Sequence, residues 1–405
     1  MRILLIKLRE PTKPTQKSTY MPPLGLWTLK TFIERDPSYT VEVADEHTGD
    51  QAALLWGTAR YDLIGLSAQF SIQHAEYVRS AKRLMQSDAF VIAGGFHASA
   101  VPEPEGVKET WAGEGEPRFQ RFLNLAGEPT GPTCRIPDGA LERYWNLAAP
   151  HDLQSKTQRW MSLETSRGCY LDCGYCGVRR YWGAWRPVPM DRILAQLDHL
   201  CSRGVEEVFI EDDNVNAVDD HFEAVVAALR ERGLWWSTPN GISAHRLLGH
   251  TKRLAPLCWR VSLPFEAGSA RSAELMGLGR KWMPFDKALS LVKALRGEGI
   301  LTAGFFIIGY PGETLEDMQR TLDYANALPL DQRNIYIATP YPGTRLYERC
   351  IEEGWLAKKD EQLYDALLYT VGLVNTAEFK SEQVEQLKWR DRAAALARKQ
   401  NAARS

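Results

Sequence analysis

Short apolar runs alternate with stretches of helical apolar spacing along the first third of the chain. Four of these runs have the length of buried strands, namely Ile3–Ile6, Val41–Ala44, Leu63–Ser67 and Phe90–Ala93. Between them, Leu24–Ile33 and Ala75–Met85 have helical spacing. Strands that alternate with helices predict a parallel sheet with right-handed crossovers. We therefore expect a Rossmann-like α/β domain over residues 1–130, which would bind a ligand at the carboxyl ends of its strands.

The same alternation restarts after a connector at residues 131–158, which is rich in turn-forming residues. The expected strands are Met161–Thr165, Val208–Ile210, Trp235–Ser237, Trp259–Leu263, Thr302–Ile308 and Asn334–Ala338. The expected helices are Asp191–Arg203, Asp220–Arg232, Pro284–Gly297 and Thr314–Leu328. Six β/α units predict a partial (β/α)6 barrel over residues 159–355, with its chemistry at the C-terminal ends of the strands. We expect a small helical region with a frayed end at residues 356–405.

Composition changes this picture little. The chain has 405 residues, of which 44% are hydrophobic and 25% charged, and its formal net charge is -2. These values are ordinary for a globular protein, and they give no reason to expect nucleic acid or an anionic membrane as a partner. No run approaches the roughly 20 apolar residues that cross a bilayer, and the N-terminus lacks the pattern of a signal peptide. We therefore expect a cytoplasmic protein.

Three of the seven cysteines lie close together, directly after the first expected strand of the second domain. They are Cys169, Cys173 and Cys176, in the segment Glu164-Thr-Ser-Arg-Gly-Cys-Tyr-Leu-Asp-Cys-Gly-Tyr-Cys-Gly. Thiolates on one tight loop suit an iron–sulfur cluster, and three of them leave one iron open to a ligand. The alternative is a zinc site, but zinc normally takes a second cysteine pair or a Cys/His set, and no second pair occurs in the sequence.

The CxxxCxxC pattern after a strand resembles the signature of the radical S-adenosylmethionine (SAM) superfamily. This resemblance implies a [4Fe–4S] cluster whose open iron binds SAM. Reduction of the cluster would cleave SAM to a 5′-deoxyadenosyl radical, and the electron would come from an external reductant of the flavodoxin or ferredoxin type. Tyr175 matches the aromatic residue that the family uses near the adenine.

Four further segments follow the same family order at successive strand ends. Residues 211–214 read EDDN where the family has a GGE-type motif, and this version is associated with its cobalamin-dependent branch. Residues 262–269 resemble the GxESGS segment, residues 306–314 the segment near the adenine, and residues 339–344 the TPYPGT segment. The resemblance implies SAM-binding roles for Tyr175, Glu211, Asp212, Glu266, Ser269, Ile308 and Gly309. Taken singly, each segment also has an ordinary explanation as a helix cap or a turn.

The first domain resembles the cobalamin-binding domain that precedes many radical SAM domains. The matching segments are Pro22–Leu26, Leu66–Ser67, Gly94–Ser99 and Gly113–Glu116. The resemblance implies cofactor contacts at Leu24, Ser67, Gly94, Gly95 and His97. A Gly-Gly turn at a strand end agrees with this, because it lets a bulky ring approach the backbone.

Two histidines of this domain have alternative interpretations. His97 is either a cofactor contact or a hydrogen-bonded turn histidine. His47 lies in DEHTG, one residue short of the DxHxxG motif that supplies a lower cobalt ligand, so we expect a surface or capping role for it. The resemblance implies base-off cobalamin with no histidine ligand. Because the domain is short and Phe96 replaces a common proline, the alternative is a domain that keeps the fold without the cofactor.

The leading hypothesis is a cobalamin-dependent radical SAM methyltransferase that acts on an unactivated carbon of a small molecule. One alternative keeps the cluster but performs cyclisation, sulfur insertion or transfer of another SAM fragment. Another is a non-catalytic iron–sulfur redox protein, which would not need the SAM-binding segments. The substrate candidates are Trp185, Arg186, Tyr341 and Arg345, since arginine binds carboxylates bidentately. Their alternative roles are arginine–acid pairing and aromatic packing.

Overall fold

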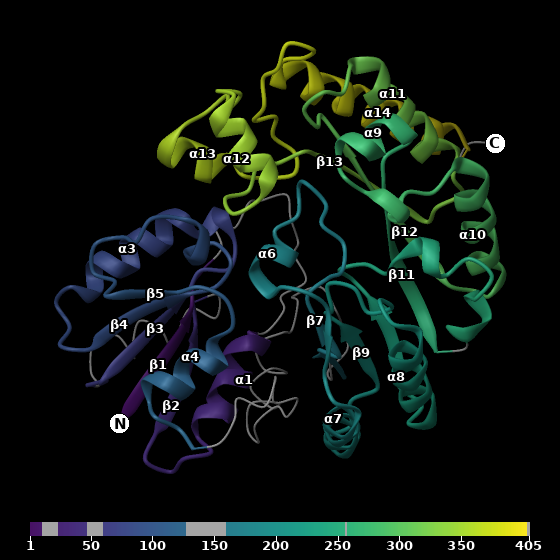
Figure 1. Ribbon diagram of the computed structural model, residues 1–405. Coiled ribbons are helices and arrows are strands. Elements are labelled where there is room, and N and C mark those ends of the chain that lie inside the picture. Colours follow the sequence, from purple (N-terminus) through teal and green to yellow (C-terminus); the bar gives the residue numbers. More distant parts are fainter. Residues whose placement is uncertain (10–22, 47–59, 127–158, 256, 403–405) are drawn as a thin grey trace. The chain divides into compact units, whose positions relative to one another are not determined.

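The computed structural model describes residues 1–9, 23–46, 60–126, 159–255 and 257–402 (Figure 1). His47 and the predicted connector at residues 131–158 lie outside them. Contacts divide the chain into two compact units. The first comprises Met1–Gly168, Tyr181–Asp212 and Ala224–Trp236, and the second comprises Cys169–Arg180, Asp213–Glu223 and Ser237–Ser405. Among the described residues, no helix is long and apolar enough to span a membrane.

The first unit contains a five-stranded sheet in the order β2-β1-β3-β4-β5, with parallel pairing throughout. Its strands are β1 (Arg2–Lys7), β2 (Thr40–Asp45), β3 (Leu63–Ser67), β4 (Phe90–Gly94) and β5 (Glu109–Trp111). Helix α3 (His74–Leu84) lies on one face of the sheet, and α1 (Leu24–Ile33) and α4 (Gly115–Phe122) lie on the other (Figure 1). The predicted Rossmann-like sheet is confirmed. The apolar runs form its core because their side chains are buried on both faces.

Two neighbouring strands of this sheet, β3 and β4, end in small residues. Ser67 ends β3 and pairs in register with Gly94, which ends β4. The turn that follows requires glycine at position 95, because its φ is 100° and an added Cβ would meet the Ala68 carbonyl oxygen at 2.6 Å. Glycine at position 95 therefore lets the turn pass close to the Ala68 backbone.

A six-stranded sheet runs in the order β13-β12-β11-β10-β9-β6. Its strands are β6 (Trp160–Leu163), β9 (Glu207–Ile210), β10 (Trp235–Thr238), β11 (Cys258–Glu266), β12 (Leu301–Ile308) and β13 (Gln332–Ile337). The pairs β6–β9, β11–β12 and β12–β13 are parallel. The helices along it are α7 (Met190–Ser202), α8 (Asp219–Glu231), α9 (Ala270–Leu275), α10 (Phe285–Gly297) and α11 (Leu315–Ala327). The predicted second α/β sheet is confirmed.

Short elements frame the cysteine loop and the C-terminal region. The antiparallel pair β7 (Ser166–Arg167) and β8 (Arg186–Pro187) and the helix α6 (Val178–Trp182) flank the cysteines in sequence. Tight 3-10 turns occur at Ser71–Gln73, Ala98–Ala100, Ala244–Arg246, Thr251–Arg253 and Gly279–Lys281. The C-terminal helices are α12 (Arg345–Glu352), α13 (Asp360–Ala366) and α14 (Ser381–Ala402). The helical tail is confirmed, and α14 extends to Ala402, into the segment expected to fray.

Candidate iron–sulfur and cofactor site

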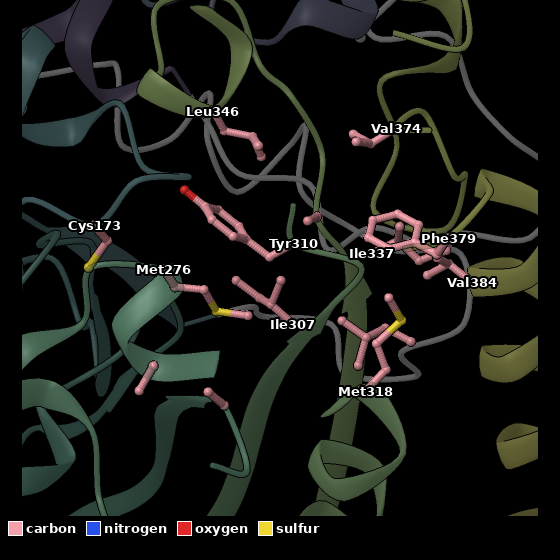
Figure 2. Packing of buried hydrophobic residues seen from close by; sticks show 14 of the residues in the cluster. Cys173, Met276, Ile307, Tyr310, Met318, Ile337, Leu346, Val374, Phe379 and Val384 are labelled. Atoms are coloured by element: carbon pink, nitrogen blue, oxygen red, sulfur yellow. The ribbon is translucent and has the colours of Figure 1, made fainter. Parts of the chain in front are cut away.

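The cysteine loop is anchored to the second unit by backbone hydrogen bonds. Gly174 N donates to the Met276 carbonyl at 2.9 Å, and Leu346 N donates to the Gly174 carbonyl at 2.9 Å. A Cβ at position 174 would clash with the Tyr310 hydroxyl, so a larger residue there would displace the tyrosine side chain. Figure 2 shows Cys173 beside Met276 and Tyr310 in one hydrophobic cluster. The loop is therefore held in part by its backbone and by packing of Cys173 in the core.

The three cysteine thiols form a donor set that fits a metal cluster. Burial raises the pKa of Cys173 and that of Cys176, the latter to about 12. The charges of Glu266 and Cys169 add to the shift at Cys173, and the charge of Cys173 adds to the shift at Cys176. The nearby Lys281 ammonium opposes both shifts. Neighbouring buried thiolates need a compensating positive centre, which a thiolate-bound iron–sulfur cluster supplies. Among the described residues, no group of three or more His, Cys, Asp or Glu side chains is arranged to hold a single metal ion.

Tyr175, Glu266 and Lys281 meet in a buried polar group beside this loop. The Tyr175 hydroxyl donates to Glu266 Oε1 at 2.8 Å, and Lys281 Nζ donates to the same oxygen at 2.7 Å. Lys281 Nζ also lies 3.0 Å from the Tyr175 hydroxyl oxygen. Burial opposes the charge on Lys281, but pairing with Glu266 outweighs it and raises the Lys281 pKa. Two predicted SAM residues are thus brought together by a lysine that the sequence analysis did not identify.

The backbone at Glu266 is strained to make this possible. Its φ is 67°, in the left-handed region, and the register of β11 against β12 shifts between Pro264 and Glu266. A bulge of this kind re-aims a side chain at the end of a strand. The strained backbone therefore accompanies the placement of the Glu266 carboxylate beside Tyr175 and Lys281.

The other predicted SAM residues of the second unit lie at strand or helix ends. Ser269 caps α9 and accepts a hydrogen bond from Ser272 N at 3.1 Å. Ile308 is the buried last residue of β12. Gly309 follows it with a φ of 80°, and a Cβ there would meet Val384 Cγ1 at 2.9 Å. Ser269 thus already serves as a helix cap, and Gly309 is needed for the backbone of the turn.

Glu211 and Asp212 lie at the end of β9 in the first unit. Asp212 is 2% exposed, and it accepts hydrogen bonds from Thr165 N at 2.7 Å, from Thr165 Oγ1 at 2.6 Å and from the Ser166 hydroxyl. Burial raises the pKa of Asp212 to about 7 against the effect of these donors. Glu211 Oε1 accepts from Ser162 Oγ at 3.4 Å. Asp212 thus holds the segment that leads into the cysteine loop.

Arg167 gathers three carboxylates within the first unit. Its guanidinium lies 2.8 Å from Glu164, 2.9 Å from Glu116 and 3.2 Å from Glu114. Arg186 pairs with Glu114 at 2.7 Å. The GEGE segment of the N-terminal region is thereby tied to the residues before the cysteine loop. The arginine–acid pairing proposed as an alternative for Arg186 is present.

His97 is buried in the predicted cofactor domain and uses both ring nitrogens. Nδ1 is hydrogen-bonded to Ser71 Oγ at 3.1 Å, and Nε2 to His74 Nδ1 at 2.9 Å. Burial, helped by the neighbouring His74, lowers the pKa of His97 to about 3, so the ring is neutral. Leu24 begins α1, and Ser67, Gly94 and Gly95 lie at the carboxyl edge of the sheet. The predicted cofactor residues Ser67, Gly94 and Gly95 are thus brought together by the pairing of β3 with β4.

The remaining substrate candidates have protein partners or partial burial. Arg345 pairs with Asp172 at 3.2 Å, and the Tyr341 ring packs against Tyr369 with 5.6 Å between centroids. Trp185 is half-buried just before β8. These positions favour pairing and packing roles in the absence of a ligand.

Comparisons with known proteins agree with this arrangement. Residues 163–325 match the model of the radical SAM superfamily. The chain is 30% identical over 270 residues to the cytidylyl-2-hydroxyethylphosphonate methyltransferase of Streptomyces wedmorensis, covering 63% of this chain and 49% of that one. It is 25% identical over 423 residues to an uncharacterized methyltransferase of Pyrococcus horikoshii, covering 96% and 90%. The chain thus spans about half of the first relative and nearly all of the second.

A solved structure shares the fold along most of the chain. It is the radical SAM methyltransferase TsrM of Kitasatospora setae with cobalamin and a [4Fe–4S] cluster bound. The TM-score is 0.65 and the identity 18%, with 89% of this chain and 79% of that one covered. At this identity the likeness establishes the fold alone. The family match covers the cysteine loop and the strands from β9 to β12, and it shows that this region is similar to the radical SAM superfamily.

Proposed function

We propose that the chain is a cobalamin-dependent radical SAM enzyme that methylates an unactivated carbon of a small molecule. The observation that carries the proposal is the junction of the three-cysteine loop with Tyr175, Glu266 and Lys281, within the region that matches the family. When bound, the [4Fe–4S] cluster and SAM supply a 5′-deoxyadenosyl radical, and cobalamin supplies a methyl carrier. Cys169, Cys173 and Cys176 hold the cluster.

The polar group beside the loop is suited to bind the nucleoside and amino-acid parts of SAM. Tyr175 and Lys281 both donate to Oε1 of Glu266, which leaves Oε2 as an acceptor for a ligand hydroxyl or amine. Ile308 and Gly309 end the neighbouring strand and offer apolar surface and backbone groups. The proposed SAM-binding set is Tyr175, Glu211, Asp212, Glu266, Ser269, Ile308 and Gly309.

Cobalamin binding is supported by the first sheet and by the relatives. Ser67, Gly94 and Gly95 lie at the carboxyl ends of β3 and β4, and parallel sheets bind ligands at this edge. His97 uses both ring nitrogens within the protein, which favours a corrin bound without a lower ligand from this histidine. The hydrogen bonds of His97 thus favour a structural role for this side chain over ligation of cobalt.

The substrate is proposed to be a small molecule, in line with the substrate class in the name of the Streptomyces relative. Trp185, Arg186, Tyr341 and Arg345 remain the candidate substrate residues. The electron that reduces the cluster is proposed to come from a flavodoxin- or ferredoxin-type protein.

The experiment that tests methyl transfer begins with anaerobic reconstitution of the full chain with iron, sulfide and cobalamin. We expect the purified protein to retain the corrin, seen in its visible spectrum, and to transfer the labelled methyl group of SAM to a small molecule from the gene's neighbourhood. Cluster-dependent SAM cleavage with no corrin retained would replace this proposal with the alternative of cyclisation, sulfur insertion or transfer of another SAM fragment. A cluster that never cleaves SAM would leave a redox protein.

A further inference from the structure

A buried amide donates a hydrogen bond to one of the cysteine sulfurs. Asn214 Nδ2 lies 3.4 Å from Cys169 Sγ, and Asn214 is only 3% exposed. The same sulfur accepts from Leu171 N at 3.4 Å, which is a backbone donor of the loop itself. Asn214 therefore adds a side-chain donor that comes from a different part of the chain, the segment after β9.

The orientation of this amide is fixed by a second layer of buried polar groups. Ser243 Oγ donates to Asn214 Oδ1 at 2.9 Å, so the amide oxygen is directed away from the sulfur and the amide nitrogen toward it. Ser243 is itself held by Asn216, whose Oδ1 accepts from Ser243 N at 2.8 Å and whose Nδ2 donates to the Ser243 carbonyl at 3.1 Å. If the amide were flipped, Asn214 Oδ1 would face Cys169 Sγ, and both of these atoms are acceptors.

An N–H dipole aimed at a thiolate sulfur acts on the charge of whatever the thiolate binds. Reduction of an iron–sulfur cluster adds negative charge to the cluster and its thiolates, and hydrogen bonds to the sulfurs are among the factors that set its potential. Such a dipole stabilises the reduced form more than the oxidised form. Its effect is larger in a buried setting, where water does not screen it. Groups outside the ligand shell commonly tune metal sites in this way.

We infer that Asn214 raises the reduction potential of the cluster by donating to Cys169 Sγ, and that Ser243 and Asn216 are positioning residues that keep its amide in the donating orientation. This inference rests on the proposed function, because it requires a [4Fe–4S] cluster on Cys169. It gives the asparagine of the EDDN segment a role that does not involve contact with SAM. An external one-electron donor of the flavodoxin or ferredoxin class then reduces a cluster whose potential this side chain has raised.

The test is an EPR-monitored redox titration of the reconstituted full chain, with iron and sulfide counted for each protein. Asn214→Leu removes the donor, Asn214→Asp keeps the shape but accepts instead of donating, and Ser243→Ala loosens the orientation. Asn326→Leu is the matched control, because Asn326 is an exposed residue of α11 whose amide bonds Asp391. Resonance Raman spectra of the same samples report the iron–sulfur stretching bands, which a purely structural role would leave in place.

We expect the midpoint to become more negative in the order wild type, Ser243→Ala, Asn214→Leu, Asn214→Asp, with Asn326→Leu equal to wild type. Fully loaded Asn214→Leu and Asn214→Asp proteins with the wild-type midpoint would overturn the inference. So would a loaded Ser243→Ala protein with that midpoint, if both Asn214 variants fail to take up the cluster. A wild-type chain that takes up no [4Fe–4S] cluster would instead overturn the proposed function, which separates the two failures.

Discussion

Lys281 Nζ lies 2.7 Å from Glu266 Oε1, and the two side chains are only 9% and 7% exposed. Removing one partner of a buried ion pair leaves the other charge uncompensated, which costs about 3–5 kcal/mol. We expect Lys281→Met to lower the free energy of unfolding by this amount, and Glu266→Gln to lower it as well. The double variant should lose less than the sum of the single losses, because it leaves no unpaired charge.

Urea unfolding of the cluster-free chain, followed by tryptophan fluorescence, measures this cycle. The exposed pair of Arg159 and Glu206 is the control, since Arg159→Met should cost about 0–1 kcal/mol. Additive losses for Lys281 and Glu266 would mean that the two groups do not interact in solution.

Arg167 is expected to be needed for stability because it neutralises three carboxylates. Arg167→Met leaves Glu114, Glu116 and Glu164 close together with Arg186 alone, and we expect a loss of about 3–5 kcal/mol. Arg167→Lys keeps the charge but not the planar guanidinium group. Its free energy of unfolding should lie between those of Arg167→Met and the wild type. Arg180→Met, which breaks an exposed pair with Glu348, is the matched control. Equal unfolding midpoints for Arg167→Met and Arg180→Met would refute this role.

His97 predicts a specific loss of stability in mild acid. Its pKa is about 3 in the folded chain and about 6.5 in the unfolded chain, so between these values only the unfolded chain binds the proton. The free energy of unfolding therefore rises with pH in this window. As pH falls below about 6.5, the free energy of unfolding decreases by up to about 1.4 kcal/mol per pH unit. Urea titrations at about pH 7 and about pH 5 measure this slope.

His97→Gln is the comparison for this slope. The variant keeps His74, which faces His97, so the difference between the two proteins isolates the buried ring. The slope between the two pH values should be shallower in the variant by about one proton. Identical slopes would show that His97 is protonated as readily in the folded as in the unfolded chain.

The extent to which the sequence predicts this structure follows from the length of each pattern. The apolar run Leu63–Ser67 coincides with β3, because its length and its place between turn signals are those of a buried strand. The stretch Leu24–Ile33 coincides with α1, because it is long enough to show helical spacing. The strands β5, β7 and β8 were not predicted. They have two or three residues each, too few for a repeating pattern.

Some residues of the candidate site could be predicted from the sequence, and others could not. The cysteine spacing predicted one loop, and Tyr175 with Glu266 followed from the family resemblance. The partners of Asp212 could not be predicted, because its bonds to Thr165 and Ser166 join positions 47 and 46 residues apart, and only the pairing of β6 with β9 brings them together. Lys281 lies in a short turn without periodicity, and its pairing depends on the bulge at Glu266.

The ligand assignment predicts that each of the three loop cysteines is required for iron binding. Serine at position 169, 173 or 176 should reduce the iron content of the anaerobically reconstituted chain from about four atoms to near none, because a serine hydroxyl is a poor substitute for a thiolate. Cys201→Ser is the control, since Cys201 lies in α7, outside the loop. Iron and sulfide assays with the visible absorption of the cluster measure the result. Full iron content in any of the three loop variants would remove that cysteine from the ligand set.

The central claim is that this chain cleaves SAM at a cluster held by Cys169, Cys173 and Cys176. The most direct measurement is mass spectrometric detection of 5′-deoxyadenosine after the reconstituted, chemically reduced chain is incubated anaerobically with SAM. We predict 5′-deoxyadenosine in the wild-type reaction and none with Cys173→Ser or without reductant. A wild-type chain with a complete, reduced cluster that leaves SAM intact would contradict the claim.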